Sequence, residues 1–286
     1  MTRAAALFLM VAAPVLWSTA GVVTRHVESA TPFEMVFWRS LFAFLTVAGV
    51  FVAVRRNPAR GGWPLALSSA LWAVMFTAFM IALTLTTTAN TLVVMSVAPL
   101  ITTVLAAVFL RDPIPLGTWL AAGAAAIGIA WMFGADLHAH TARDLSGMAI
   151  AFMVPCASAL NIVTLRRSGA AVDLRPAVMF GGLISCLVAL PLALPLQASR
   201  QDVALLAFLG IFQLGLPCML MVLASRVLLG PEIALLALLE VVLGPIWAWL
   251  GANEIPARAT LIGGLVVLAA LVANELVTSG SPRRKP

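Results

Sequence analysis

The stretch PVLWSTAGVVTR, from Pro14 to Arg25, is mostly apolar, yet it carries a proline, a Trp-Ser-Thr cluster and a glycine before it ends on a charge. A second stretch, PCASALNIVTLR, runs from Pro155 to Arg166. The two stretches have the same length and share the first proline, an internal valine and the final arginine in register. The chain therefore contains an internal repeat.

The composition around these stretches is that of a membrane protein. The chain is 62% hydrophobic and 10% charged, with a mean hydropathy of +1.07. Soluble domains are roughly 45–50% apolar and about 25% charged. The isoelectric point near 10.9 does not indicate nucleic-acid binding, because the charges lie in short loops and tails. We expect a polytopic protein whose main surroundings are the lipid bilayer.

Ten segments are long enough to cross that bilayer. A hydrocarbon core of about 30 Å needs roughly 20 apolar residues in a helix. Helices are required because lipid offers no hydrogen-bond partners to the backbone. The sequence thus predicts an all-α fold with ten transmembrane helices at residues 4–24, 32–54, 63–85, 90–110, 116–134, 146–165, 175–196, 203–225, 231–251 and 258–277.

The basic residues predict the orientation of these helices. If the N-terminus is cytoplasmic, most of the 17 Lys and Arg residues face the cytoplasm, and the exceptions are Arg25, Arg39, Arg143, Arg200 and Arg258. Cytoplasmic loops of membrane proteins carry an excess of such residues. Both termini are therefore expected in the cytoplasm, with the protein spanning the inner (plasma) membrane several times and the loop at 138–144 outside.

The repeat divides the chain into two predicted units, 1–140 and 141–286, of five helices each. Because five is odd, the second unit must be inverted relative to the first. Inverted repeats are common in secondary transporters, where substrate binds near the membrane midplane between the halves. Prolines inside helices remove a hydrogen bond and bend the helix. Kinks at Pro14, Pro155 and Pro217 are expected to flank a central cavity, although intramembrane prolines often serve packing alone.

Four stretches resemble the drug/metabolite transporter superfamily in its EamA branch: VLWSTAGVVTR, TPFEMVFWRSLFA, ALTLTTTANTLVVMSVAPLITTVLAAVFLRD and LLALLEVVLGPIWAWLGANE. The resemblance covers nearly the whole chain. It implies ten helices in two inverted halves around a cavity, and export of amino acids or other small metabolites. The LWST motif with its glycine and basic residue is most similar to aromatic amino acid exporters. One departure is Glu240-Val241 where the family often has Glu-Pro, so a kink displaced toward Pro245 is expected.

Polar residues near the two prolines are candidates for binding substrate. Trp17, Ser18 and Gly21 share a helix face with Pro14, because residues three and four apart are neighbours. Ser158 shares a face with Pro155, and Asn161 lies beside it. The alternative is helix packing, in which small and hydroxyl residues join membrane helices. For Trp17 the alternative is a lipid-facing position.

Two further helices contribute candidates. Thr77 and Met80 lie on one stripe of the third predicted span, and Gln213 lies with Pro217 on the eighth. A glutamine in hydrocarbon needs a hydrogen-bond partner or water. Methionine suits surfaces that accept several ligands, but such stripes also occur in plain cores.

Arg39 and Glu240 are the charges placed most clearly inside spans, where ionisable residues are costly and commonly functional. Arg39 could instead extend its charged end to the interface. Glu240 could carry a coupling proton, pair with Arg39, or make a polar contact between helices.

These features favour a transporter over an enzyme. No P-loop, HExxH motif or intramembrane histidine is present, and the three cysteines form no CxxC pair, so no catalytic residue, cofactor or metal site is expected. The predicted function is export of small neutral or zwitterionic metabolites, chiefly amino acids including aromatic ones, by alternating access. The alternatives are a channel-like facilitator or a broad-range efflux carrier for hydrophobic compounds. The sequence implies no obligate protein partner and no nucleic acid.

Overall fold

A computed structural model describes residues 1–53, 61–86, 88–111, 114–134, 141–169 and 172–252, together with isolated helical positions between 262 and 273. These residues form helices and connecting turns, and the described part contains no strand. Most of the predicted span 258–277 lies outside the described residues, as do positions 138–140 of the loop expected outside.

The first half of the chain follows the predicted spans with several interruptions. The helices are α1 (Arg3–Trp17), α2 (Ala20–Thr24), α3 (Pro32–Ala53), α4 (Gly62–Leu85), α5 (Thr88–Met95), α6 (Ala98–Leu105), the π-helical segment η1 (Ala106–Leu110) and α7 (Leu116–Gly134). The span predicted at 90–110 is broken at Ser96 and Val97, just before Pro99. Proline cannot donate the backbone hydrogen bond that would continue the helix.

The second half contains α8 (Ala142–Ser168), α9 (Pro176–Ala193), α10 (Arg200–Phe208), the π-helical segment η2 (Leu209–Gly215), α11 (Leu216–Ala224), α12 (Gly230–Ala237) and α13 (Leu239–Ala252). The three predicted kinks differ. Helix α1 ends three residues after Pro14, α8 continues through Pro155, and Pro217 is the second residue of α11, just after η2. The break between α12 and α13 lies at Leu238, beside Glu240 and well before position 245.

Seven stretches of the described residues are long and apolar enough to cross a membrane: Arg3–Thr24, Pro32–Ala53, Gly62–Leu85, Ala142–Ser168, Pro176–Ala193, Arg200–Ala224 and Gly230–Gly251. Two shorter apolar stretches, Ala98–Leu110 and Leu116–Gly128, fall at predicted spans. The all-helical, multi-pass membrane class is thereby confirmed, while the count of ten spans remains a prediction.

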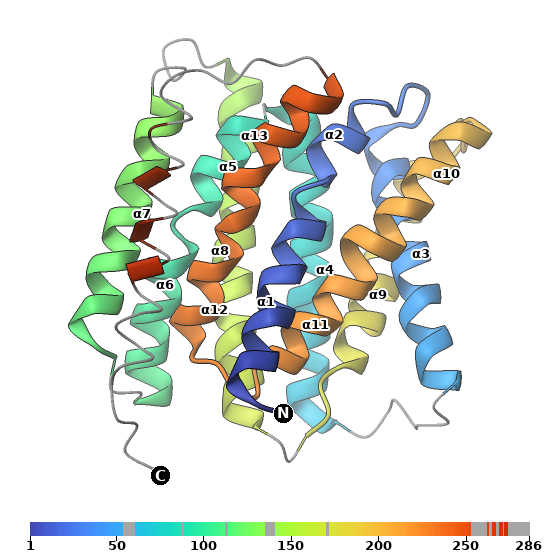
Figure 1. Ribbon diagram of the computed structural model, residues 1–286. Helices are drawn as coiled ribbons and strands as arrows, with labels where there is room; N and C mark the ends of the chain where they lie inside the picture. Colours follow the sequence, from blue (N-terminus) through green and yellow to red (C-terminus); the bar gives the residue numbers. More distant parts are fainter. Residues whose placement is uncertain are drawn as a thin grey trace.

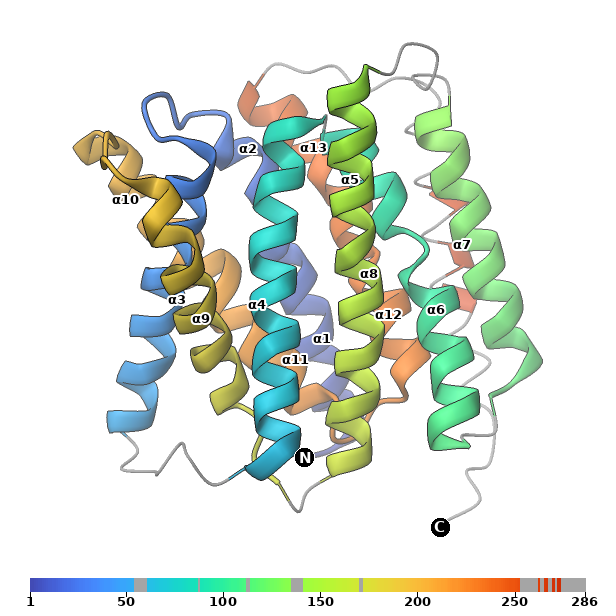
Figure 2. The ribbon, with the colours of Figure 1, turned by 180° about the vertical axis from the view of Figure 1, so that it is seen from behind.

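The helices lie side by side in one bundle, and α1 rises from the N-terminus toward α2 in Figure 1. Helix α8 runs the opposite way to α4 (Figure 2), and Thr86 after α4 accordingly reaches Asp144 in the first turn of α8. The most extensive helix–helix contacts join the two predicted halves. Helix α3 packs on α9, and α4 packs on both α8 and α9. The halves therefore share one hydrophobic core.

Glycines allow the closest of these contacts. A Cβ atom on Gly181 of α9 would lie 2.4 Å from Trp72 Cβ of α4, and one on Gly210 of η2 would lie 2.6 Å from the backbone oxygen of Arg39 in α3. Small residues let membrane helices approach in this way. The backbones of α4 and α9, and of α3 and η2, consequently lie closer than any other residue would permit.

Two buried carboxylates link segments at one end of the bundle by hydrogen bonds. Glu34, at the start of α3, accepts hydrogen bonds from the backbone N–H groups of Gln197 and Ala198 at 2.7–3.1 Å. Asp202, in the first turn of α10, accepts from the N–H groups of Glu28 and Ser29, both at 3.1 Å. These bonds tie the first turn of α3 to the loop between α9 and α10, and the loop after α2 to the first turn of α10.

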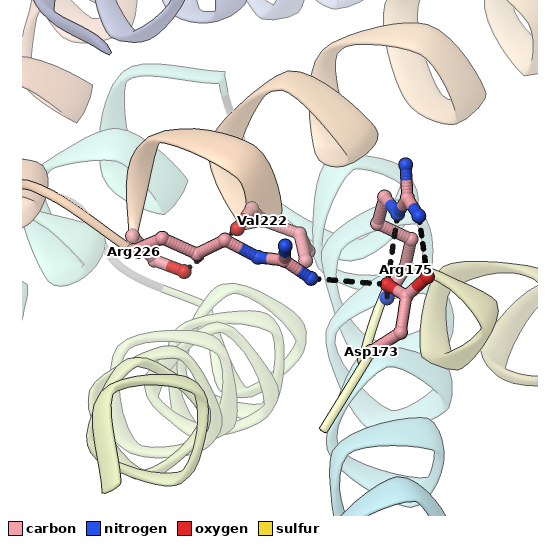
Figure 3. Close-up of polar contacts among 5 residues, drawn as sticks. Asp173, Arg175, Val222 and Arg226 are labelled. Carbon is pink, nitrogen blue, oxygen red and sulfur yellow. Dashed lines mark hydrogen bonds and ion pairs between the residues drawn. The ribbon is translucent and has the colours of Figure 1, made fainter. Parts of the chain in front are cut away.

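A second polar cluster lies at the opposite end, between the α8–α9 loop and the end of α11 (Figure 3). Arg175 donates to both carboxylate oxygens of Asp173, and Arg226 donates to one of them at 3.2 Å. Burial opposes ionisation of Asp173, but the hydrogen bonds from Arg175 and the two positive charges outweigh it. They hold the pKa of Asp173 below its ordinary value.

Replacing Asp173 should weaken this link in a pH-dependent way. Because the folded-state pKa is depressed, the contribution is present at neutral pH and is lost as the pH falls through that pKa. We expect Asp173→Asn to lower the unfolding free energy by about 1 kcal/mol at pH 7 and by progressively less at acidic pH. Chemical unfolding in micelles at several pH values measures this. Glu28→Gln, at an exposed loop carboxylate, is the control, and an equal loss at every pH would contradict the argument.

Candidate functional site

A cavity of about 120 Å³ lies inside the bundle, between helices of both halves. It is lined from the first half by α1, α3, α4, α5 and α6, and from the second by α8, η2, α11, α12 and α13. We call it the central cavity. The sequence-derived candidates that line it are Trp17, Arg39, Pro155, Ser158, Gln213 and Glu240.

Arg39 is the most buried charge in this cavity, with 2% of its surface exposed. Its Nε donates to Oε1 of Gln213 at 3.1 Å, and its guanidinium carbon lies 5.4 Å from the centre of the Phe79 ring. Gln213 in turn donates to the backbone oxygen of Trp17 at 3.3 Å. Arg39 therefore points into the bundle rather than to the interface, and Gln213 finds the partners that a glutamine in hydrocarbon requires.

The Nη1 nitrogen of Arg39 is buried and has no hydrogen-bond partner among the described residues. An unpaired buried donor on a charged group is expensive, and the cost is relieved when an acceptor arrives. Arg39, which lines the central cavity, thus retains an unused positively charged donor.

Glu240 supplies the opposite charge. It lies in the first turn of α13, immediately after the break at Leu238, and it lines the same cavity as Arg39. Within the described part of the chain, no ion pair within 4 Å joins Glu240 to Arg39, and the Glu240 carboxylate makes no hydrogen bond there. The two charges thus face one cavity without contacting each other.

The rest of the wall is mostly apolar, and α4 supplies an aromatic face to it. Helix α4 contributes Trp72, Met75, Phe76 and Phe79, which follow one helix face at spacings of three and four residues. Sequence reasoning missed this face and chose the neighbouring stripe of Thr77 and Met80. The aromatic spacing on α4 was the signal that could have identified it.

The structure places several other candidates outside the central cavity. Thr77 is hydrogen-bonded to Ser185 at 2.9 Å, Met80 is fully buried between helices, and Asn161 Oδ1 accepts from Ser68 at 2.7 Å. Thr77 thus joins α4 to α9 and Asn161 joins α8 to α4, which is the packing alternative. Pro14 and Pro217 are buried in their helices and do not line the cavity.

Ser18 and Gly21 lie along a route toward one end of the bundle. They line a small space of about 10 Å³ that shares Trp17, Phe79 and Glu240 with the central cavity. That space shares Gly21 and Thr88, among others, with a third cavity of about 560 Å³, which we call the vestibule. Trp247 donates to Ser18 Oγ at 2.8 Å beside this route. The vestibule contains the charged residues Arg25, Arg143 and Asp144.

Direct contacts hold the opposite end of the bundle together. Arg3 at the start of α1 forms an ion pair of 2.9 Å with Glu232 in the first turn of α12. Arg166 near the end of α8 donates to the backbone oxygen of Leu228, just before α12. These contacts join α1, α8 and α12 on the side away from the vestibule.

The helical bundle defines a multi-pass membrane protein with an internal cavity. Residues 4–134 match the EamA-like transporter family, which is the branch of the drug/metabolite transporter superfamily that the sequence resembles. A crystal structure aligns over 98% of this chain and 100% of its own at 17% identity, with a TM-score of 0.83, which shows a shared fold. No curated protein matches the chain significantly. That family is one of membrane transporters for small substrates.

Proposed function

We propose that the protein exports small neutral or zwitterionic metabolites across the inner membrane, chiefly amino acids and including aromatic ones. The observation that carries the proposal is the central cavity, which combines an aromatic wall with Arg39, Gln213 and Glu240. An amino acid needs polar partners for its backbone end and an apolar surface for its side chain. The cavity offers both within one buried space.

Alternating access between two inverted halves, 1–140 and 141–286, is the mechanism we propose. Two features support it: α4 and α8 run antiparallel, and the main helix contacts cross between the halves. The route through Ser18 and Gly21 leads toward one end, whereas the Arg3–Glu232 ion pair fastens the other. With both termini cytoplasmic, as the basic residues predict, the vestibule faces outward.

A broad-range efflux carrier for hydrophobic compounds is the second candidate, because Trp72, Phe76 and Phe79 would accept any apolar solute. The buried charges argue against it, since an apolar ligand would leave the open donor of Arg39 without a partner. A channel-like facilitator is the third candidate.

Counterflow in proteoliposomes tests the proposal. We expect vesicles preloaded with unlabelled phenylalanine or leucine to accumulate the labelled amino acid transiently, with saturation at high concentration. The screen extends over the twenty amino acids with and without a pH gradient, and empty liposomes are the control. Unsaturated flux would indicate a channel, and flux of lipophilic dyes without any amino acid would favour the efflux carrier.

A further inference from the structure

The central cavity contains two opposite charges that the protein leaves unpaired. Arg39 Nη1 is buried without a hydrogen-bond partner, and the Glu240 carboxylate makes no ion pair, among the described residues. Both side chains line the cavity. Each of these charges is costly to keep inside a membrane. A carrier for an apolar ligand would gain no binding energy from either one.

The position of Arg39 is held by its neighbours. Gln213 accepts from Nε, and the ring of Phe79 lies against the guanidinium, so its remaining donors keep a defined direction. A guanidinium presents its N–H donors in a planar fork that matches a carboxylate. Charge-assisted hydrogen bonds of this kind are about twice as strong as neutral ones. A carboxylate is therefore the ligand group that best satisfies the remaining N–H donors of Arg39.

Glu240 sets a complementary requirement. It is fixed in the first turn of α13, and it borders both the central cavity and the small space next to Trp17. A carboxylate in this setting is stabilised by a cation that brings its own hydrogen-bond donors. An ammonium group fulfils both conditions, since it offers three donors and one positive charge.

We propose that Arg39 and Glu240 together bind a zwitterion: Arg39 pairs with the carboxylate of an α-amino acid and Glu240 pairs with its ammonium group. The inference rests on the proposed transport function and specifies how that cavity recognises its substrate. A zwitterion adds no net charge to the membrane interior, because each of its charges meets one of opposite sign. The side chain of the amino acid then lies against the aromatic wall of α4, at Trp72 and Phe76.

Ligands that lack one charge test the proposal on the unaltered protein. Phenylalanine is compared with 3-phenylpropionate, which lacks the ammonium, and with phenethylamine, which lacks the carboxylate. Binding to the purified protein in micelles is measured by competition against labelled phenylalanine. We expect each analogue to bind roughly tenfold or more weakly than phenylalanine, because each leaves one buried charge unpaired. Equal binding of all three ligands overturns the proposal.

Two variants separate recognition from a purely structural role. Arg39→Gln should reduce phenylalanine affinity and shift the preference toward phenethylamine, whereas Glu240→Gln should shift it toward 3-phenylpropionate. A structural defect would weaken all ligands alike and would produce no opposite shifts. Leu187→Met, at an exposed position on α9 outside the cavity lining, is the control and should keep the order of the three ligands.

The outcomes also distinguish this inference from the proposed function. Saturable amino acid counterflow with unchanged ligand preference in both variants would retain the transporter and reject the pairing. Absence of both counterflow and phenylalanine binding in the unaltered protein would reject the proposed function, and the pairing with it. If either variant fails to fold, the three-ligand comparison on the unaltered protein still decides the question.

Discussion

Ser158→Trp should strongly reduce transport, whereas Leu160→Trp, two residues further along the same helix, should leave it nearly unchanged. Ser158 lines the central cavity, and Leu160 is 37% exposed on the outside of α8. An indole at position 158 would occupy space that the substrate requires. Overpacking of this kind costs about 1–3 kcal/mol, so we expect amino acid counterflow to fall about five- to 150-fold.

Comparing these two variants separates the effect of the position from the effect of the tryptophan side chain itself. Both variants introduce the same side chain into α8, so general effects of tryptophan on insertion or expression are shared. Counterflow is compared at equal amounts of reconstituted protein. Unimpaired transport in Ser158→Trp would show that the substrate path does not pass through the central cavity.

Alanine at Gly210 should destabilise the protein strongly. The added Cβ would lie 2.6 Å from the backbone oxygen of Arg39 and 2.6 Å from Phe42 Cβ, so η2 and α3 would have to separate. Because the oxygen belongs to the backbone of a helix, no side-chain rotation can relieve the contact. We expect a loss of about 1–3 kcal/mol of unfolding free energy. The same separation should weaken the Gln213–Arg39 hydrogen bond and thus lower phenylalanine affinity.

Gly49 provides a matched control on α3, since a Cβ atom there would meet nothing within 4 Å. Gly49→Ala should be neutral or stabilising by up to about 1 kcal/mol, because alanine is the better helix former. Thermal unfolding in micelles measures both variants. Equal stability of Gly210→Ala and Gly49→Ala would mean that the helices are not as close as described.

Much of this protein follows from its sequence alone. The hydrophobic runs predict membrane helices, because the bilayer thickness sets their length and its lack of water requires internal hydrogen bonding. The described helices begin and end close to the predicted residues, as in Pro32–Ala53 and Gly62–Leu85. The motif around Trp17 resembles the transporter superfamily, and it lies within residues 4–134, which match the EamA-like transporter family. Charges at positions 39 and 240 were recognisable because they interrupt apolar runs.

The rotation of each helix about its axis was decided by the tertiary structure. In α4 nearly every side chain is apolar, so the sequence offers little contrast between the face toward lipid, the face toward another helix and the face toward the cavity. Thr77 and Trp72 are equally plausible from sequence, yet Thr77 meets Ser185 and Trp72 lines the cavity. Only the packing of α4 against α8 and α9 selects between them.

The same limit applies to single polar side chains. Sequence placed Asn161 in the cavity because an amide in hydrocarbon needs a partner, but the partner proved to be Ser68 on a neighbouring helix. Gln213 obeys the same requirement and meets Arg39 in the cavity wall. The sequence determined that these groups must be paired, since an unpaired polar group in a membrane is costly. Which partner each one meets depended on how helices distant in the chain pack together, and only the tertiary structure decided that.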